Sequence, residues 1–147
     1  MKKTIIIMTA IILSVCMMYA AYSDELLTKT INCGDDFYTF TFDNDLKTLQ
    51  YSLNGFYAYK TNTLIGTNVS KYWAAAGPEG AVLVYKVEPN SFPYVLIDHK
   101  TGNIVKTGYL YVDKYDVKDV KVIPTQTGAK ITVYYVTGGD KSFELNF

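Results

Sequence analysis

The chain has 147 residues, and its 14 basic residues, all lysine, balance 14 acidic ones to give a formal net charge of zero. Hydrophobic residues make up 49% of the sequence, so the chain can bury a core and does not have the composition of a disordered segment. Without arginine or clustered lysines it is a poor nucleic-acid binder, because phosphate recognition favours both.

The N-terminal segment has the layout of a secretory signal peptide. Lys2 and Lys3 precede the apolar run Thr4–Val15, and small residues follow. Cleavage after Ser23 places the small residue Ala21 at the −3 position. We therefore expect a removed leader, residues 1–23, and a mature domain, residues 24–147, that lies in the bacterial periplasm or is secreted and has no transmembrane span.

Two cysteines bear on this reading. The segment Leu13–Cys16 resembles a bacterial lipobox, which would make Cys16 a lipid anchor, but Val15 stands where a small residue is expected, so we favour ordinary cleavage. The mature chain then has Cys33 alone and no internal disulfide. Cys33 is then either buried or available for a bridge to another molecule, and its strand spacing from Ile31 favours burial.

The mature chain consists of short runs in which apolar and polar residues alternate, separated by Gly, Asn, Asp or Pro, as in β-strands and their turns. In order, the expected strands are Asp24–Cys33, Phe37–Phe42, Leu49–Leu53, Phe56–Tyr59, Ala81–Val87, Phe92–Ile97, Ile104–Val112, Lys118–Ile123, Ile131–Val136 and Ser142–Phe147. Between the sixth and seventh strands Gly102 can supply the positive φ of a hairpin turn, and Asn54-Gly55 marks another. The pattern predicts a single-domain antiparallel β-sandwich or barrel of nine or ten short strands.

A binding site is predicted from the aromatic residues. Tyrosine is a favoured strand residue, yet 12 of the 14 tyrosines remain after cleavage, and Tyr and Trp also anchor interfaces and stack on sugars. The segment Ala74–Gly80 contains Gly and Pro and reads as a long loop next to an aromatic pair. The candidate binding residues are Tyr72, Trp73, Gly77, Pro78 and Glu79.

Few residues support catalysis or metal binding. His99 is the only histidine and lies in a predicted turn that Asp98 nucleates, so we interpret it as a turn residue. No nucleophile, zinc or phosphate-loop motif is present, and we expect no catalytic residue, metal or cofactor. Two predicted turns carry acidic residues that could bind calcium, namely Asp35, Asp36, Asp43 and Asp45, but their spacing does not fit an EF-hand loop. A glycosidase needs two carboxyl groups at a set separation, and the sequence alone does not place such a pair.

Two segments resemble a known family. Cys33–Gly55 is similar to the opening of the small periplasmic or lipid-anchored C-type lysozyme inhibitors, and Trp73–Leu83 is similar to their Trp-and-Gly segment. The family's Ser-Gly-x-x-Tyr loop and its disulfide partner cysteine are missing, and Val84–Phe147 has no counterpart. The resemblance implies an inhibitory role but assigns no inhibitory residue.

These observations predict an exported, non-catalytic binding protein whose partner is a protein or a glycan. Two alternatives stay open. One is a periplasmic inhibitor or immunity-type protein, in line with the resemblance, and the other is a structural component of the envelope that assembles through an exposed strand edge.

Overall fold

The computed structural model describes residues 20–23, 28–113 and 116–147. These residues form twelve β-strands and no helix, and hence no helix that could cross a membrane. The strands are β1 (Ala20–Ser23), β2 (Thr28–Cys33), β3 (Asp36–Asp43), β4 (Thr48–Asn54), β5 (Tyr59–Gly66), β6 (Val69–Gly77), β7 (Gly80–Val87), β8 (Pro93–Asp98), β9 (Ile104–Tyr109), β10 (Val117–Pro124), β11 (Gly128–Tyr135) and β12 (Asp140–Asn146).

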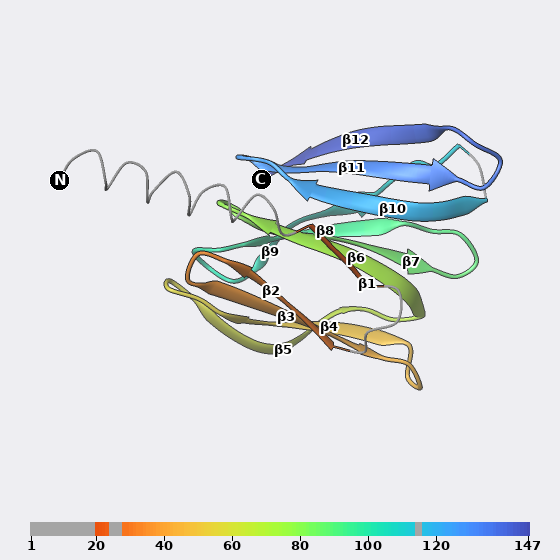
Figure 1. Ribbon diagram of the computed structural model, residues 1–147. Helices are drawn as coiled ribbons and strands as arrows, with labels where there is room; N and C mark the ends of the chain where they lie inside the picture. The colour runs from red at the N-terminus through yellow and green to blue at the C-terminus, as the bar shows by residue number, and fades with distance from the viewer. Residues whose placement is uncertain (1–19, 24–27, 114–115) are drawn as a thin grey trace.

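The strands form three antiparallel sheets that are stacked as layers (Figure 1). Each sheet is a meander in which consecutive strands pair: β2–β5 form the four-stranded sheet, and β10–β12 form the three-stranded sheet. The middle sheet has the order β1-β6-β7-β8-β9, so only β1 joins out of chain order. The middle sheet lies between the other two.

Burial on both faces explains the apolar runs of the middle sheet, because a strand covered on both sides has no need for polar alternation. In β6, Tyr72, Ala74 and Ala76 face a core shared with the four-stranded sheet, whereas Trp73 and Ala75 face a second core shared with the three-stranded sheet. The strands β7 and β8 alternate in the same way. The middle sheet therefore packs one face against the four-stranded sheet and the other against the three-stranded sheet, and it contributes to both cores.

The outer sheets bury only one face each. In β3 the prediction is confirmed: Tyr38 and Phe40 are buried, while Thr39 and Thr41 face outward. The turn expected at Gly102 is confirmed, since Gly102 has a φ of 68° between β8 and β9. The strand expected at Phe56–Tyr59 is wrong: β5 begins only at Tyr59, and residues 55–58 form a loop that the hydrogen bond from the Gly55 N–H to the Ala58 carbonyl closes. The C-terminal segment pairs with β11 as strand β12.

The all-β prediction is confirmed. In place of the expected sandwich or barrel of nine or ten strands, the structure has twelve strands in three stacked antiparallel sheets. The long loop expected at Ala74–Gly80 is absent. Val69–Gly77 continues as β6, and only Pro78 and Glu79 separate it from β7. Residues 61–66, which lie outside the expected strands, belong to strand β5.

Cys33 is buried as predicted, but it is disulfide-bonded, which corrects the expectation that it has no disulfide. The other cysteine of the chain, Cys16, and with it the question of a lipid anchor, lies outside the described residues. Most of the predicted leader also lies outside them. Its last four residues, Ala20–Ser23, form β1 and pair with β6.

Candidate functional site

The structure does not present the predicted aromatic pair to solvent. The side chains of Tyr72 and Trp73 are 1% and 2% exposed, and they point from adjacent positions of β6 into the two different cores. The indole Nε1–H of Trp73 donates to the Asp119 carboxylate at 3.0 Å, which ties β6 to β10. Both residues are therefore core residues, and an exposed aromatic pair does not exist at this place.

The other three predicted residues lie at the β6–β7 turn. Gly77 is buried and pairs with Gly80, while Pro78 is half-buried and Glu79 is exposed. The Glu79 carbonyl accepts a hydrogen bond from the His99 backbone N–H at 3.1 Å, so this turn is joined to the β8–β9 turn. The β6–β7 turn is therefore a short connection that is hydrogen-bonded to the β8–β9 turn. A binding role for its exposed residue, Glu79, stays a prediction.

The four-stranded sheet β2–β5 has an outer face that no other sheet covers, which we call the open face. The strand register aligns its side chains in three rows across all four strands, and all of them are exposed or half-buried. The rows are Asn32, Phe37, Asn54 and Tyr59; Thr30, Thr39, Ser52 and Asn62; and Thr28, Thr41, Gln50 and Leu64. None of these twelve side chains carries a charge.

Hydrogen bonds within the open face hold its polar side chains in place. The hydroxyls of Thr30 and Thr39 lie 3.1 Å apart across β2 and β3. On the next pair of strands, the Ser52 hydroxyl accepts the Asn62 backbone N–H at 3.0 Å. Side chains held in this way lose less conformational entropy when a ligand binds them.

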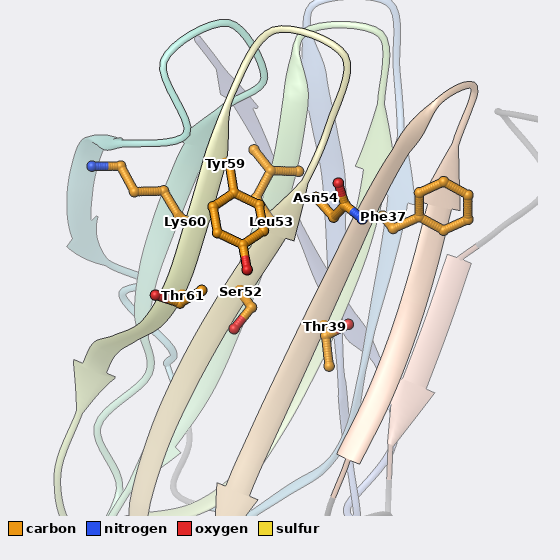
Figure 2. Close-up of a pocket in the computed structure, with 8 residues that line it drawn as sticks. All are labelled: Phe37, Thr39, Ser52, Leu53, Asn54, Tyr59, Lys60 and Thr61. Atoms are coloured by element: carbon orange, nitrogen blue, oxygen red, sulfur yellow. The ribbon is translucent and has the colours of Figure 1, made fainter.

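A groove of about 380 Å³ lies at one end of the open face. Figure 2 shows the Phe37 and Tyr59 rings on opposite sides of it, with Asn54 between them. The two rings are 44% and 71% exposed. The remaining lining residues are Thr39, Ser52, Leu53, Lys60 and Thr61. No carboxylate lines the groove.

The aromatic surface continues into the β4–β5 loop at the same end. Phe56 and Tyr57 are exposed, and their rings meet edge to face at 4.8 Å. The loop is anchored from below, because the Asp36 carboxylate accepts the Phe56 backbone N–H at 3.0 Å. Tyr57 also packs edge-on against His99, with 5.7 Å between ring centroids.

His99 is a turn residue, as predicted, and it links two sheets. Its Nδ1 lies 3.5 Å from the Asp36 carboxylate, which belongs to the four-stranded sheet. The Tyr51 hydroxyl of that sheet donates to the Gly102 carbonyl of the same turn at 2.7 Å. The histidine therefore positions the loop that carries Phe56 and Tyr57.

Asp98 builds the turn that holds His99, also as predicted. Its carboxylate accepts hydrogen bonds from the backbone N–H and the hydroxyl of Thr101, each at 2.8 Å. Burial alone raises the pKa of the Asp98 carboxyl. The Thr101 hydrogen bonds, together with the nearby His99 and Lys100, lower it by more, so the pKa lies below its ordinary value of 3.8.

A second groove, of about 390 Å³, lies where the β7–β8 turn meets the segment that follows β9. The exposed residues Tyr109 and Tyr111 line it, together with Asn90 and Ser91, above the buried ring of Phe92. This groove is local, since its lining residues come from two short segments, residues 90–92 and 109–112. We use it below as a matched comparison for the open face.

The acidic turns do not gather into a metal site. Asp43 accepts the backbone N–H groups of Asp45 and Leu46, each at 2.9 Å, and so caps its own turn. Among residues 20–23, 28–113 and 116–147, no group of three or more His, Cys, Asp or Glu side chains is placed to hold a metal ion.

Comparison with models of protein families, with curated proteins and with solved structures gave no match, so the likeness to lysozyme inhibitors stands on the two quoted segments alone.

Sequence reasoning missed the open face. The alternation of Phe37–Phe42 predicts an outer face at Thr39 and Thr41, but an outer face by itself indicates only contact with solvent. What distinguishes this surface is the register that brings uncharged residues of four strands together, with Phe37 and Tyr59 in one row. The sequence does carry one signal for this surface. The outward positions contain no lysine, aspartate or glutamate in three segments, Thr28–Asn32, Phe37–Thr41 and Gln50–Asn54.

Proposed function

We propose that this chain is an exported, non-catalytic binding protein whose ligand is a neutral glycan bound on the open face. The observation that carries the proposal is the groove, in which two exposed aromatic rings flank an amide and no carboxylate is present. Tyr and Phe rings stack on the apolar faces of sugar rings, and amides and hydroxyls satisfy sugar hydroxyls in any orientation.

The charge distribution supports a neutral ligand. None of the twelve row side chains is charged, and Lys60 is the one charged residue among the eight that line the groove. An anionic polymer would be expected to meet several lysines or a helix N-terminus.

The same lining supports a proposal of binding without catalysis. Glycoside hydrolysis uses two carboxyl groups, about 5–9 Å apart, on either side of the scissile bond. The residues that line the groove include no aspartate and no glutamate. We therefore propose that the groove holds a sugar without cutting it.

The dimensions of the open face suit a chain of sugars rather than one sugar. Neighbouring strands lie about 4.8 Å apart, so four strands span roughly 15 Å, and the rows run across all of them. The groove lies at one end of this surface, and the threonine rows extend from it. We therefore expect affinity to rise with glycan length until the rows are covered.

A glycan array probed with the purified exported protein tests the proposal. We expect binding to one class of neutral oligosaccharide that persists in about 0.5 M salt, since screening weakens charge interactions and not stacking. The Tyr59→Ala variant should lose it, and the Tyr134→Ala variant, which removes an exposed tyrosine from the three-stranded sheet, should keep it. Loss in both variants, or binding only to anionic glycans, would reject the open face as the site.

A second candidate function is supported by the β4–β5 loop. Phe56 and Tyr57 are exposed and adjacent, and Asp36 and His99 hold the loop that carries them. A preorganised aromatic loop of this kind suits insertion into a cleft of another protein, as an inhibitor or immunity-type protein requires. A stoichiometric protein partner that is captured by wild type, lost in Phe56→Ala and kept in Tyr59→Ala would favour this function over glycan binding.

A further inference from the structure

The first row of the open face alternates amides and aromatic rings. In strand order it consists of Asn32 on β2, Phe37 on β3, Asn54 on β4 and Tyr59 on β5, and the register pairs each residue directly with the next. All four residues are exposed, and Figure 2 shows Asn54 between the Phe37 and Tyr59 rings. Amide and ring therefore recur on every second strand.

The spacing of the strands sets the repeat that a ligand must match. Neighbouring strands lie about 4.8 Å apart, so the two strands that carry rings are about 10 Å apart, and so are the two that carry amides. Sugars joined by equatorial β-1,4 bonds form an extended chain, in which each sugar advances by nearly one strand spacing and is turned by a half-turn from its neighbour. Every second sugar of such a chain presents the same face to the sheet, which is the period of the row.

We propose that the open face binds a linear, neutral, β-1,4-linked glycan that lies across the strands, with one sugar over each residue of the first row. The inference rests on the proposed function and names the linkage and the direction of its ligand. Phe37 and Tyr59 stack on alternate sugars, and Asn32 and Asn54 hydrogen-bond the sugars between them. An α-1,4-linked chain does not match the row, because its axial bonds coil it and its sugars do not turn over in alternation.

The second row supplies hydroxyls along one edge of the glycan. Thr30, Thr39 and Ser52 lie two residues further along their strands, about 7 Å from the first row. The hydroxyls of Thr30 and Thr39 lie 3.1 Å apart, so they hold each other in place before a ligand binds. The hydroxyls of an equatorially substituted sugar project sideways from its ring, and they face this row while the ring itself stays on the aromatic residues.

Calorimetric titration with linear oligosaccharides of two to five sugars tests the linkage. The two neutral β-linked series are β-1,4-linked glucose and β-1,4-linked N-acetylglucosamine, and α-1,4-linked glucose is the control. We expect at least one β-linked series to bind, with an affinity that rises up to four sugars and then levels. The α-linked tetrasaccharide should bind about tenfold more weakly or worse, because a coiled chain does not stack on both rings.

Asn32 tests the direction of the chain, because it lies on β2, and the fourth sugar reaches it only when the chain crosses all the strands. Asn32→Ala should weaken binding of the β-linked tetrasaccharide about fivefold, as expected for one lost hydrogen-bonding amide. Binding of the trisaccharide, which covers the residues from Phe37 to Tyr59, should stay unchanged and shows that the variant is folded. A chain that lay along β4 would reach Gln50 instead, so Gln50→Ala is the matched amide variant.

Two results would overturn the inference and leave the proposed function in place. One is α-linked oligosaccharides that bind as tightly as β-linked ones and lose binding in Tyr59→Ala. The other is a loss of tetrasaccharide affinity in Gln50→Ala that equals or exceeds the loss in Asn32→Ala. Absence of binding to both β-linked series would also overturn the inference, and the other neutral glycans of the array would then decide the proposed function.

Discussion

At the residue scale, burial separates the aromatic residues that stabilise the fold from those that are available to a ligand. Trp73 packs against Phe92 with 6.4 Å between ring centroids and donates to Asp119, whereas Phe37 and Tyr59 stand in solvent at the groove. Trp73, Phe37 and Tyr59 are all aromatic residues of a type that is favoured in β-strands. Their different roles depend on which sheet covers them.

Substitution of Trp73 should therefore damage stability rather than binding. Trp73→Ala leaves a large cavity in the second core and should cost about 3–5 kcal/mol in the free energy of unfolding. Trp73→Phe keeps most of the packing but removes the Asp119 hydrogen bond, and should cost about 1–2 kcal/mol. Urea denaturation measures both values. A fully stable Trp73→Ala variant with impaired ligand binding would restore the surface role that the sequence suggested.

The β8–β9 turn should make stability depend on pH in the acid range. Because the pKa of Asp98 is lower in the folded chain than in the unfolded one, its carboxylate stabilises the fold above about pH 4, and this contribution is lost as the pH falls further. Urea midpoints between pH 2 and pH 6 should fall less steeply for Asp98→Asn than for wild type. Asp35→Asn, in the exposed β2–β3 turn, is the control and should follow the wild-type slope.

At the scale of elements, alternation predicted most strands, and its failures have a physical cause. The outer sheets bury one face, so the alternation of Phe37–Phe42 and Ser142–Phe147 was readable. The run Trp73–Gly77 has no alternation, because β6 is covered on both faces, and the Pro78 that follows suggested a loop. An apolar run such as Trp73–Gly77 fits a strand that is buried on both faces, but an alanine run followed by Gly and Pro also fits a loop.

The tight β6–β7 turn makes Gly80 irreplaceable. Gly80 has a φ of 147°, and a Cβ atom there would lie 2.0 Å from the Ile97 carbonyl oxygen of β8. Gly80→Ala should cost about 4 kcal/mol, through backbone strain and displacement of β8. Gly139→Ala is the matched comparison, since Gly139 also has a positive φ, of 85°, but open space around it, and it should cost about 1 kcal/mol. Thermal denaturation of the two variants should differ accordingly, and equal losses would contradict the close approach to β8.

At the scale of the whole molecule, the middle sheet couples the two outer sheets. Leu83 of β7 faces the core shared with the four-stranded sheet, and Leu96 of β8 faces the other core. Neither outer sheet can separate without exposing an apolar face of the middle sheet. The number of layers was not predictable from the sequence, because strand periodicity shows which residues share a face but not which faces meet.

This coupling predicts a single unfolding transition. Leu83→Ala and Leu96→Ala should each cost about 2–5 kcal/mol, and each should lower the same midpoint. Trp73 fluorescence reports the core next to the three-stranded sheet, and circular dichroism reports all three sheets. The two signals should coincide in both variants. A transition seen by circular dichroism but not by fluorescence in Leu83→Ala would show that the four-stranded sheet unfolds by itself.

The glycan-binding proposal concerns the whole open face and is tested most directly by calorimetric titration of the best neutral oligosaccharide. Wild type should be compared with Phe37→Ala/Tyr59→Ala and with Tyr109→Ala/Tyr111→Ala, which removes the aromatic residues of the second groove. Two lost stacking contacts of about 1 kcal/mol each should weaken binding by the open-face variant roughly thirtyfold, and the second-groove variant should bind like wild type. Unchanged affinity in the open-face variant, or loss confined to the second-groove variant, would contradict the proposal.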